Sequence, residues 1–184
     1  MRKVILFRIH PVGDGCTSSI VLLQTCTPNC TPLHEYFMLS RWHKERRCRI
    51  TSSNAHRIWT RRGDEEGLAE KLCSQRSFST AATKYGSATE AHARRMFGSR
   101  HHTPVLETGL IVSVAQPWLC GSPDGIFWIN GEPHLLEIKC PFSRAGKDLY
   151  DSETRATYVP YLEFVGEKLQ LKKHHTYHTQ VQLL

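Results

Sequence analysis

The chain has 184 residues, and its 24 Lys and Arg against 17 Asp and Glu give a formal charge of +7. This length suits one domain with a substantial core, and no repeat or long low-complexity tract indicates a second domain. No apolar run reaches the length of a membrane-spanning helix, which excludes an integral membrane protein of the helical kind. The basic excess suits a polyanionic partner, although basic runs are more often solvated faces.

Residues 1–32 are expected to be a poorly ordered lead-in. Two short apolar runs, at residues 4–7 and 20–23, are separated by a stretch rich in Gly and Ser, so at most a stray strand pair is expected there. The charged start is like that of a signal peptide, but Arg8 ends the apolar run well short of the length that such a peptide needs. We therefore expect a soluble, intracellular protein.

The seven cysteines form no repeated CxxC pair. Cys26, Cys30 and His34 have a spacing that zinc ligands can take, but no fourth ligand is evident, so a zinc site is the less favoured interpretation. An odd number of scattered cysteines is typical of reduced thiols inside a cell. Cys120 and Cys140 are expected to be small core residues on the buried side of strands.

Three helices are predicted before residue 80. Apolar residues at helical spacing predict a helix over residues 33–47, and shorter helices are expected at residues 53–60 and 64–73. Ser53 is a candidate N-cap of the second of these helices. Basic residues gather at 41–62 and again at 168–178, which is where a polyanion could be bound.

A longer helix is predicted over residues 80–100, and it carries a candidate metal ligand. Glu90 lies on one stripe of this helix with Ala93 and Phe97. A carboxylate on a buried stripe is costly without a cation or a hydrogen-bond partner, so Glu90 is a candidate acid of a metal site. The alternative is a partly exposed Glu90 that pairs with Arg94 one turn later.

An antiparallel sheet of three strands is predicted at residues 105–114, 125–129 and 135–139. Asn130-Gly131 is the strongest hairpin signal in the chain, so the second and third of these strands are expected to pair. Residues two apart in a strand face the same side, which places Glu137 and Lys139 on one face. The hairpin should also bring Asp124 close to both.

Carboxylates this close repel one another unless a cation lies between them, and oxygen ligands favour a hard divalent ion such as Mg²⁺. Such an ion can polarise a phosphodiester and lower the pKa of a bound water, while Lys139 can hold that water or screen charge on the phosphate. The order Asp124, Glu137, Lys139 is thus one that a metal-dependent nuclease requires. The alternative is a hairpin with a charged solvent face, because such spacings are common by chance.

The C-terminal part is expected to be irregular over residues 144–167 and to end in a helix from about residue 172. That helix carries Gln180, whose amide could hydrogen-bond the attacking water or a phosphate oxygen. Helices packed around a small mixed sheet give an α/β fold class.

Five short motifs occur in the order found in one nuclease family. They are Arg49-Ile50-Thr51-Ser52-Ser53, Tyr85-Gly86 with Glu90, Ser122-Pro123-Asp124-Gly125, Glu137-Ile138-Lys139-Cys140-Pro141-Phe142, and Tyr177 with Gln180-Val181-Gln182. Over about residues 42–184 the chain resembles the YqaJ-type viral recombinases, the family of the lambda-type exonucleases within the PD-(D/E)xK nuclease superfamily. The resemblance implies a restriction-endonuclease-like core in a nuclease domain over residues 33–184.

The same resemblance implies a magnesium site, in which Mn²⁺ can substitute and two ions are expected. The implied metal ligands are Asp124, Glu137, Glu90 and the carbonyl of Ile138. Lys139 would position the attacking water, and Gln180 would complete the site. The implied ligands of a terminal 5′-phosphate are Arg46, Ser53, Ser122 and Arg144. Arg144 falls one position from where the family has a basic residue.

The resemblance departs from the family at the C-terminus. Family members continue beyond the Gln180 motif through the rest of a helix and usually a further strand or two. We therefore expect a C-terminally incomplete domain whose sheet lacks an edge strand, with unpaired backbone groups and weaker support for Gln180.

These inferences predict a magnesium-dependent DNA exonuclease that hydrolyses phosphodiester bonds from 5′-phosphorylated duplex ends in recombination or repair. The implied partners are DNA ends and a single-strand annealing protein, and a ring-forming homo-oligomer is open by resemblance. One alternative is a catalytically inactive module, derived from a nuclease, that binds DNA ends or recruits a partner. Another is a restriction or repair endonuclease on the same core.

Overall fold

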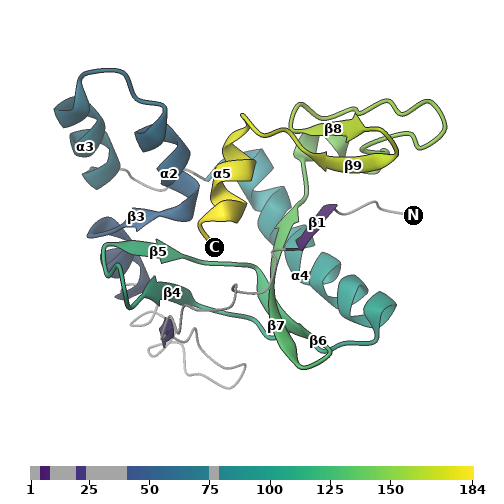
Figure 1. The fold of residues 1–184 in the computed structure, drawn as a ribbon, viewed down its shortest axis with the longest axis horizontal. Helices are drawn as coiled ribbons and strands as arrows, with labels where there is room; N and C mark the ends of the chain where they lie inside the picture. The colour runs from purple at the N-terminus through teal and green to yellow at the C-terminus, as the bar shows by residue number, and fades with distance from the viewer. Residues whose placement is uncertain (1–4, 9–19, 24–40, 75–78) are drawn as a thin grey trace.

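A computed structural model of the protein describes residues 5–8, 20–23, 41–74 and 79–184. Small β-sheets and the helices packed against them make up this part of the chain (Figure 1), so the predicted α/β class is confirmed. The candidate zinc ligands and most of the predicted lead-in lie outside the described residues, and the domain boundary at residue 33 stays a prediction.

The central sheet has three antiparallel strands in the order β1-β7-β6. Its strands are β1 (Ile5–Arg8), β6 (Gly125–Ile129) and β7 (Glu132–Lys139). The turn between β6 and β7 consists of Asn130 and Gly131, with φ of 53° and 84°. Positive φ at both residues is what a type I′ turn requires, so the predicted hairpin is confirmed together with its turn.

The third strand of this sheet is not the predicted one. Leu106 forms only an isolated bridge with Ile126, and the chain then leaves the sheet as Thr108 donates a hydrogen bond to the carbonyl of Pro123 at 2.8 Å. The next strand, β4 (Leu110–Ser113), belongs to a second sheet, and β1 takes the place beside β7. An apolar alternation predicts that a strand exists but does not specify its partner.

The second sheet is mixed and has the order β2-β4-β5-β3. Its remaining strands are β2 (Ile20–Leu23), β3 (Ile50–Thr51) and β5 (Leu119–Gly121). β3 pairs with β5 in parallel, while the other pairs are antiparallel. The two N-terminal apolar runs therefore do form strands, but they pair with β7 and β4 and not with one another.

The helices lie close to their predicted positions. Residues 41–47 are helical, and α2 (Ser52–Trp59), α3 (Glu65–Cys73) and α4 (Ala81–His101) follow. Ser53 is not an N-cap, because α2 begins one residue earlier and its cap is Thr51, which makes no side-chain capping bond. In the part of the chain that the structure describes, no helix is both long and apolar enough to cross a membrane.

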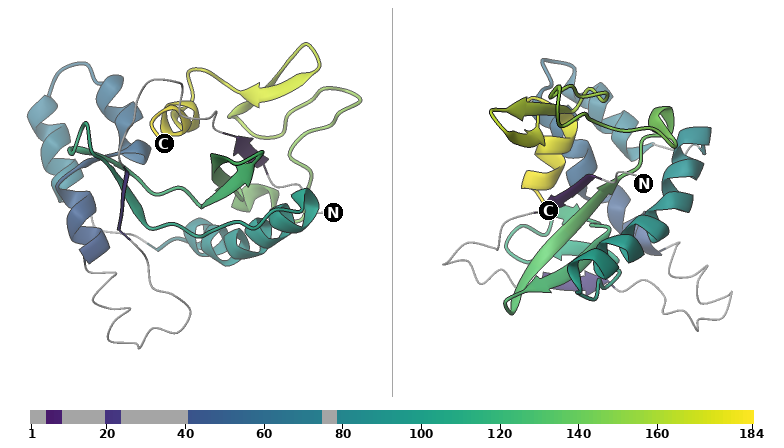
Figure 2. Two further views of the ribbon diagram at one scale, coloured as in Figure 1. Left: turned by 60° about the horizontal axis from the view of Figure 1, so that its bottom comes forward. Right: turned by 90° about the vertical axis from the view of Figure 1, so that its right-hand side faces the viewer.

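Helix α4 covers one face of the β6–β7 hairpin (Figure 2). Ala93 and Phe97 pack there in one buried cluster with Phe127, Leu136 and Ile138. Each large apolar side chain buried in this way contributes about 1.5–3 kcal/mol to stability. Because Glu90 lies three and seven residues before Ala93 and Phe97, the same packing turns it toward β7.

The C-terminal part is more regular than expected. After a 3₁₀ turn (Phe142–Arg144), β8 (Leu162–Val165) and β9 (Lys168–Leu171) form a hairpin whose two-residue turn begins with Gly166 at φ 61°. Helix α5 (Thr176–Gln182) begins later than residue 172, because residues 172–175 form a turn that is closed by a backbone bond from His175 to Lys172. It lies between α2 and the hairpin (Figure 1).

Candidate active site

Strand β7 supplies a carboxylate and an ammonium group to the site from one face. Leu136 and Ile138 are buried in the core beneath α4, and Glu137 and Lys139 project from the opposite face. The Lys139 ammonium donates a hydrogen bond to Glu137 Oε1 at 2.5 Å. The predicted pair is therefore brought together by strand alternation alone.

Asp124 immediately precedes β6 and continues the hairpin ladder. Its backbone N–H donates to the carbonyl of Leu136 at 2.9 Å, and its Oδ2 accepts from the N–H of Ile138 at 2.5 Å. In an antiparallel strand the N–H and C=O of one residue point to the same side. The carbonyl of Ile138 is thus directed to the side of β7 on which Asp124 lies, beyond the end of β6.

Helix α5 closes the site from above. Gln180 Nε2 donates to Glu137 Oε1 at 2.6 Å, and the Lys139 ammonium lies 4.8 Å from the ring centroid of Tyr177. Tyr177 and Gln180 are three residues apart, so they share one face of the helix. The contact of Tyr177 with Lys139 was not predicted, although this spacing is the signal that could have shown it.

Glu90 enters the site together with Arg94. Arg94 forms an ion pair with Glu90 Oε1 at 2.7 Å and donates from Nε to the carbonyl of Asp124 at 2.7 Å. It also pairs with Glu107. The structure thus shows the alternative interpretation, a partly exposed Glu90 that pairs with Arg94 one turn later, and the role of Glu90 as a metal ligand stays a prediction. Arg94 also ties α4 to the residue before β6.

Each acid of the site has a raised pKa. Burial raises the pKa of Glu137 to about 7, with a further rise from Asp124 and Glu90 and an opposing effect from Lys139. Burial also raises the pKa of Asp124, against the bond from Ile138 and the charge of Lys139. The pKa of Glu90 is raised by burial and by Asp124, against Arg94. A bound cation would therefore stabilise the ionised form of each carboxylate.

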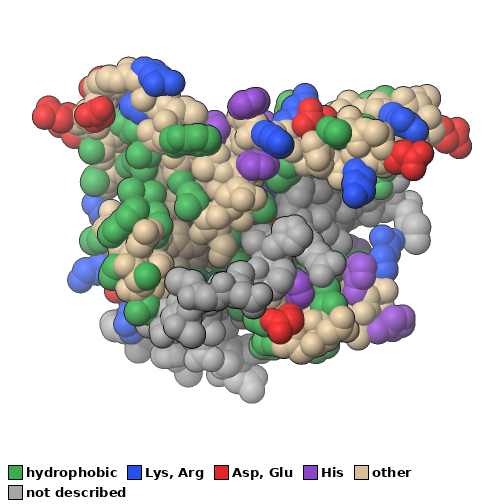
Figure 3. All heavy atoms as spheres, in the orientation of Figure 1, with side chains coloured by type: hydrophobic (Ala, Val, Ile, Leu, Met, Phe, Trp, Pro, Cys, Tyr) green, Lys and Arg blue, Asp and Glu red, His purple; other side chains and the backbone are tan. Residues whose placement is uncertain are grey.

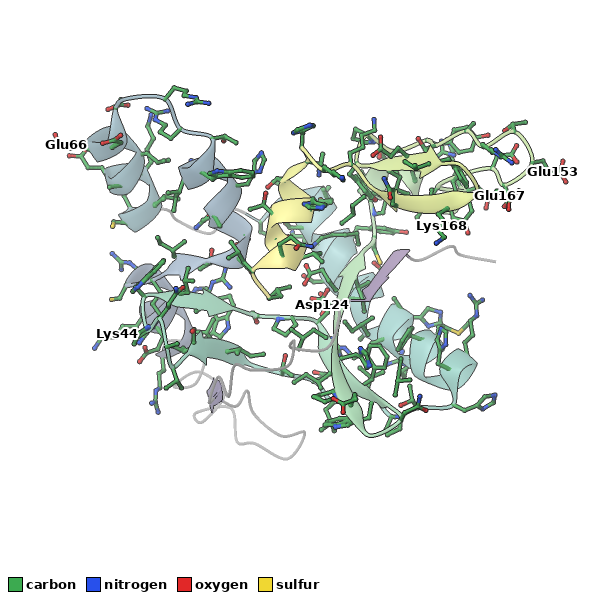
Figure 4. All side chains as sticks on the ribbon, viewed as in Figure 1. Lys44, Glu66, Asp124, Glu153, Glu167 and Lys168 are labelled. Atoms are coloured by element: carbon green, nitrogen blue, oxygen red, sulfur yellow. The ribbon has the colours of Figure 1, made fainter. Side chains whose placement is uncertain are left out.

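The donor set fits a hard divalent cation. Glu137 is only 2% exposed, and its Oε2 is buried without a hydrogen-bond partner. In the described ranges no three His, Cys, Asp or Glu side chains form a ready metal cage. Mg²⁺ does not need one, since it usually keeps several waters and binds through one or two carboxylates. Glu137, Asp124 and the carbonyl of Ile138 can supply that set; Figure 4 places Asp124 in the middle of the molecule beside β7.

Two of the four candidate phosphate ligands lie together. Arg46 Nη2 is 3.5 Å from Ser53 Oγ, which in turn is 2.9 Å from Thr51 Oγ1. The guanidinium of Arg46 stacks 4.4 Å from the ring centroid of Trp42, and burial lowers its pKa. A partly buried Arg beside two hydroxyl groups is a suitable site for an oxyanion.

The other two candidates have different surroundings. Ser122 Oγ donates to the carbonyl of Gly109 at 3.2 Å. Arg144 donates to the carbonyl of Asp148 from Nε at 2.8 Å, and its guanidinium lies 4.8 Å from the ring centroid of Tyr158. Among the described residues, neither Ser122 nor Arg144 shares a hydrogen bond with Arg46. Arg144 is held instead by the carbonyl of Asp148 in its own loop.

Comparison with known proteins identifies the family of the chain. The family described as YqaJ-like viral recombinase domain matches residues 41–183, which confirms the resemblance carried by the motifs. No curated protein gives a match.

Among solved structures, similarity is found to the alkaline exonuclease LHK-Exo of Laribacter hongkongensis, with a TM-score of 0.47 and 28% identity over 59% of this chain and 60% of that one. A complex of LHK-Exo with dAMP gives a TM-score of 0.45 and 22% identity, again over 59% of this chain and 60% of that one. The chain thus spans only part of the length of these proteins.

Proposed function

Since the chain belongs to the YqaJ-like viral recombinase domain family through residues 41–183, we propose that it is a divalent-metal-dependent deoxyribonuclease that acts in recombination or repair. The observation that supports this most is the environment of Glu137. One of its carboxylate oxygens accepts from both Lys139 and Gln180, while the other is buried with no hydrogen-bond partner in the part of the chain that the structure describes. A buried acid with one oxygen left free in this way is suited to a metal ligand.

The ligands of Mg²⁺, or of Mn²⁺ in its place, would be Glu137, Asp124, the carbonyl of Ile138 and, for a second ion, Glu90. When bound, the cation would supply Lewis acidity to the scissile phosphodiester and to the water that attacks it. Gln180 fixes Glu137 through its 2.6 Å hydrogen bond, as partners of metal ligands commonly do.

Lys139 is the group suited to the proton and charge changes of hydrolysis. Its ammonium is held between Glu137 and the ring of Tyr177, so its position is set from two sides. From there it can hold the attacking water and stabilise negative charge as it develops on the phosphate. Arg94 joins Glu90 to the carbonyl of Asp124, immediately before β6.

The finer substrate assignment is a duplex DNA end with a 5′-phosphate. The Arg46 and Ser53 pair supports it, because a partly buried guanidinium beside a hydroxyl group suits a terminal phosphate. Ser122 and Arg144 are further candidates from the family resemblance. A single-strand annealing protein as partner and a ring-forming homo-oligomer remain predictions of that resemblance.

The test is a cleavage assay on duplex DNA that is either linear with a 5′-phosphate, linear with a 5′-hydroxyl, or circular. We expect mononucleotide release from the phosphorylated linear duplex with Mg²⁺ and none in EDTA. Cleavage that persists in EDTA would contradict the metal site. Cleavage of circular duplex would make the protein an endonuclease, and binding of ends without cleavage would make it an inactive end-binding module.

A further inference from the structure

An open pocket of about 450 Å³ lies between the β8–β9 hairpin and the start of α5. Its lining residues are Glu163, Lys172, Lys173, His174 and His175. Histidine and Lys or Arg side chains gather along the same upper edge of the molecule, beside hydrophobic side chains over α2 (Figure 3). None of these lining residues belongs to the site around Glu137.

The basic side chains of this pocket are open to solvent. Lys172, Lys173 and His174 are exposed, and none of them has an ion pair among the residues that the structure describes. The loop that carries them is nevertheless fixed, because the N–H of Lys172 donates to the carbonyl of Tyr161 at 3.0 Å. Glu163 is the single acid in the lining, and its Oε1 accepts from Gln170 at 3.4 Å.

A short chain of rings joins the pocket to the candidate active site. The His175 ring lies 4.8 Å from the Tyr177 ring, and the Tyr177 ring lies 4.8 Å from the Lys139 ammonium. The His175 side of the pocket is therefore within about 10 Å of Lys139.

An exposed aromatic side chain lies on the α2 side of the pocket. Trp59 is 75% exposed, and its ring is 6.4 Å from that of His56. His56 Nδ1 in turn lies 2.7 Å from Thr179 Oγ1 of α5. Through His56, Trp59 is thus connected to α5, the helix whose start borders the pocket.

We propose that this pocket and Trp59 form a binding site for a single-stranded polynucleotide, in which Lys172, Lys173 and His174 hold a backbone phosphate and Trp59 stacks a base. An unpaired cationic groove beside an accessible aromatic ring is the combination that single-strand sites use. The inference rests on the proposed function for its biological meaning, since the site would hold a strand near the scissile bond.

The test measures binding of a fluorescent single-stranded oligonucleotide by anisotropy in EDTA, with the full chain. Lys172→Ala/Lys173→Ala should bind about tenfold more weakly, and its slope of log affinity against log salt should fall by about 1.4, or 0.7 for each lost phosphate contact. The matched control is Lys71→Ala/Lys84→Ala, which removes two exposed lysines outside the basic runs at 41–62 and 168–178 and should weaken binding by about twofold or less.

Two further variants test the two halves of the site. Glu163→Gln should tighten binding by about twofold, because it removes the one negative charge in the lining. Trp59→Ala should weaken oligonucleotide binding by about tenfold, whereas Trp118→Ala, at a tryptophan that is 53% exposed on β4–β5, should not. Equal losses in the two double-lysine variants, or an unchanged salt slope, would overturn the proposal.

Inorganic phosphate separates a strand site from a site for a free anion. We expect the oligonucleotide to stay bound in millimolar phosphate. If the double lysine substitution weakens phosphate binding but leaves oligonucleotide binding unchanged, the strand assignment is overturned. Because binding is measured in EDTA, its outcome is independent of cleavage. If the protein cleaves duplex DNA but the Lys172 and Lys173 substitutions do not weaken oligonucleotide binding, only the strand-binding proposal is overturned. If these substitutions weaken binding but the protein does not cleave DNA, only the proposed nuclease activity is overturned.

Discussion

The acid site on β7 and the candidate phosphate site around α2 are held in different ways. Asp124 is fixed relative to Glu137 and Lys139 by two hydrogen bonds within the hairpin. Its backbone N–H donates to the carbonyl of Leu136, and its carboxylate accepts from the N–H of Ile138. Arg46 reaches Ser53 only through a long side chain that stacks on Trp42. Positions set by a sheet register follow from alternation and turn residues, whereas positions set by long side chains depend on packing that only the folded chain shows.

The largest effect is expected from Lys139→Ala. Loss of the ammonium removes the group that holds the water and stabilises charge, so cleavage should fall about a thousandfold. DNA affinity should change by about twofold or less, as judged by anisotropy, because one charge of a basic protein is lost. Lys168→Ala is the control, and similar activity losses in both variants would break the contrast between the site and the surface.

The next effect is on stability in the absence of divalent ions. From pH about 5 to about 7 the unfolded chain has lost the Glu137 proton while the folded protein keeps it, so the free energy of unfolding falls as pH rises. A pKa of about 7 against the ordinary 4.5 corresponds to about 3 kcal/mol across that range. Denaturant unfolding of wild type and Glu137→Gln in EDTA measures the free energy of unfolding against pH. If this free energy depends on pH in the same way in both proteins, the raised pKa of Glu137 is contradicted.

Gln180→Leu tests the support that α5 gives to the acid site. It removes the hydrogen bond to Glu137 Oε1 but leaves the charges in place. Cleavage should fall about 10–100-fold, as for other partners of metal ligands. Gln182→Leu, at an exposed position two residues further along α5, is the matched change and should have little effect. Equal rates in the two variants would show that α5 does not position Glu137.

Arg46→Ala and Arg144→Ala sharpen the comparison within the phosphate site. If Arg46 binds the terminal phosphate, its loss should reduce the preference for 5′-phosphate over 5′-hydroxyl ends by about tenfold, the value of one charged hydrogen bond. Arg144, which is held by Asp148 and Tyr158, should change that preference by less than about twofold. The reverse result would assign the phosphate to the 144–148 loop.

Much of the site could be predicted from the sequence because local rules determine it. The Asn130-Gly131 turn set the hairpin, the two-residue period set Glu137 beside Lys139, and the helical period turned Glu90 toward β7. What was missed depends on pairing between distant segments.

The place of β1 beside β7, the second sheet and the contact between Tyr177 and Lys139 join residues far apart in the chain. The β8–β9 hairpin is a different case. Its apolar residues alternate on both sides of Gly166, and this local pattern by itself indicates a hairpin.

Calorimetric titration with Mg²⁺ tests most directly whether Glu137, Asp124 and their partners form a metal site. Wild type should bind Mg²⁺ saturably, and Asp124→Asn should lose that binding because it removes a charged oxygen ligand next to the Ile138 carbonyl. Glu153→Gln, which changes an exposed acid at the far edge of the molecule (Figure 4), should bind as wild type does. No saturable binding by wild type, or equal binding by Asp124→Asn, would contradict the account.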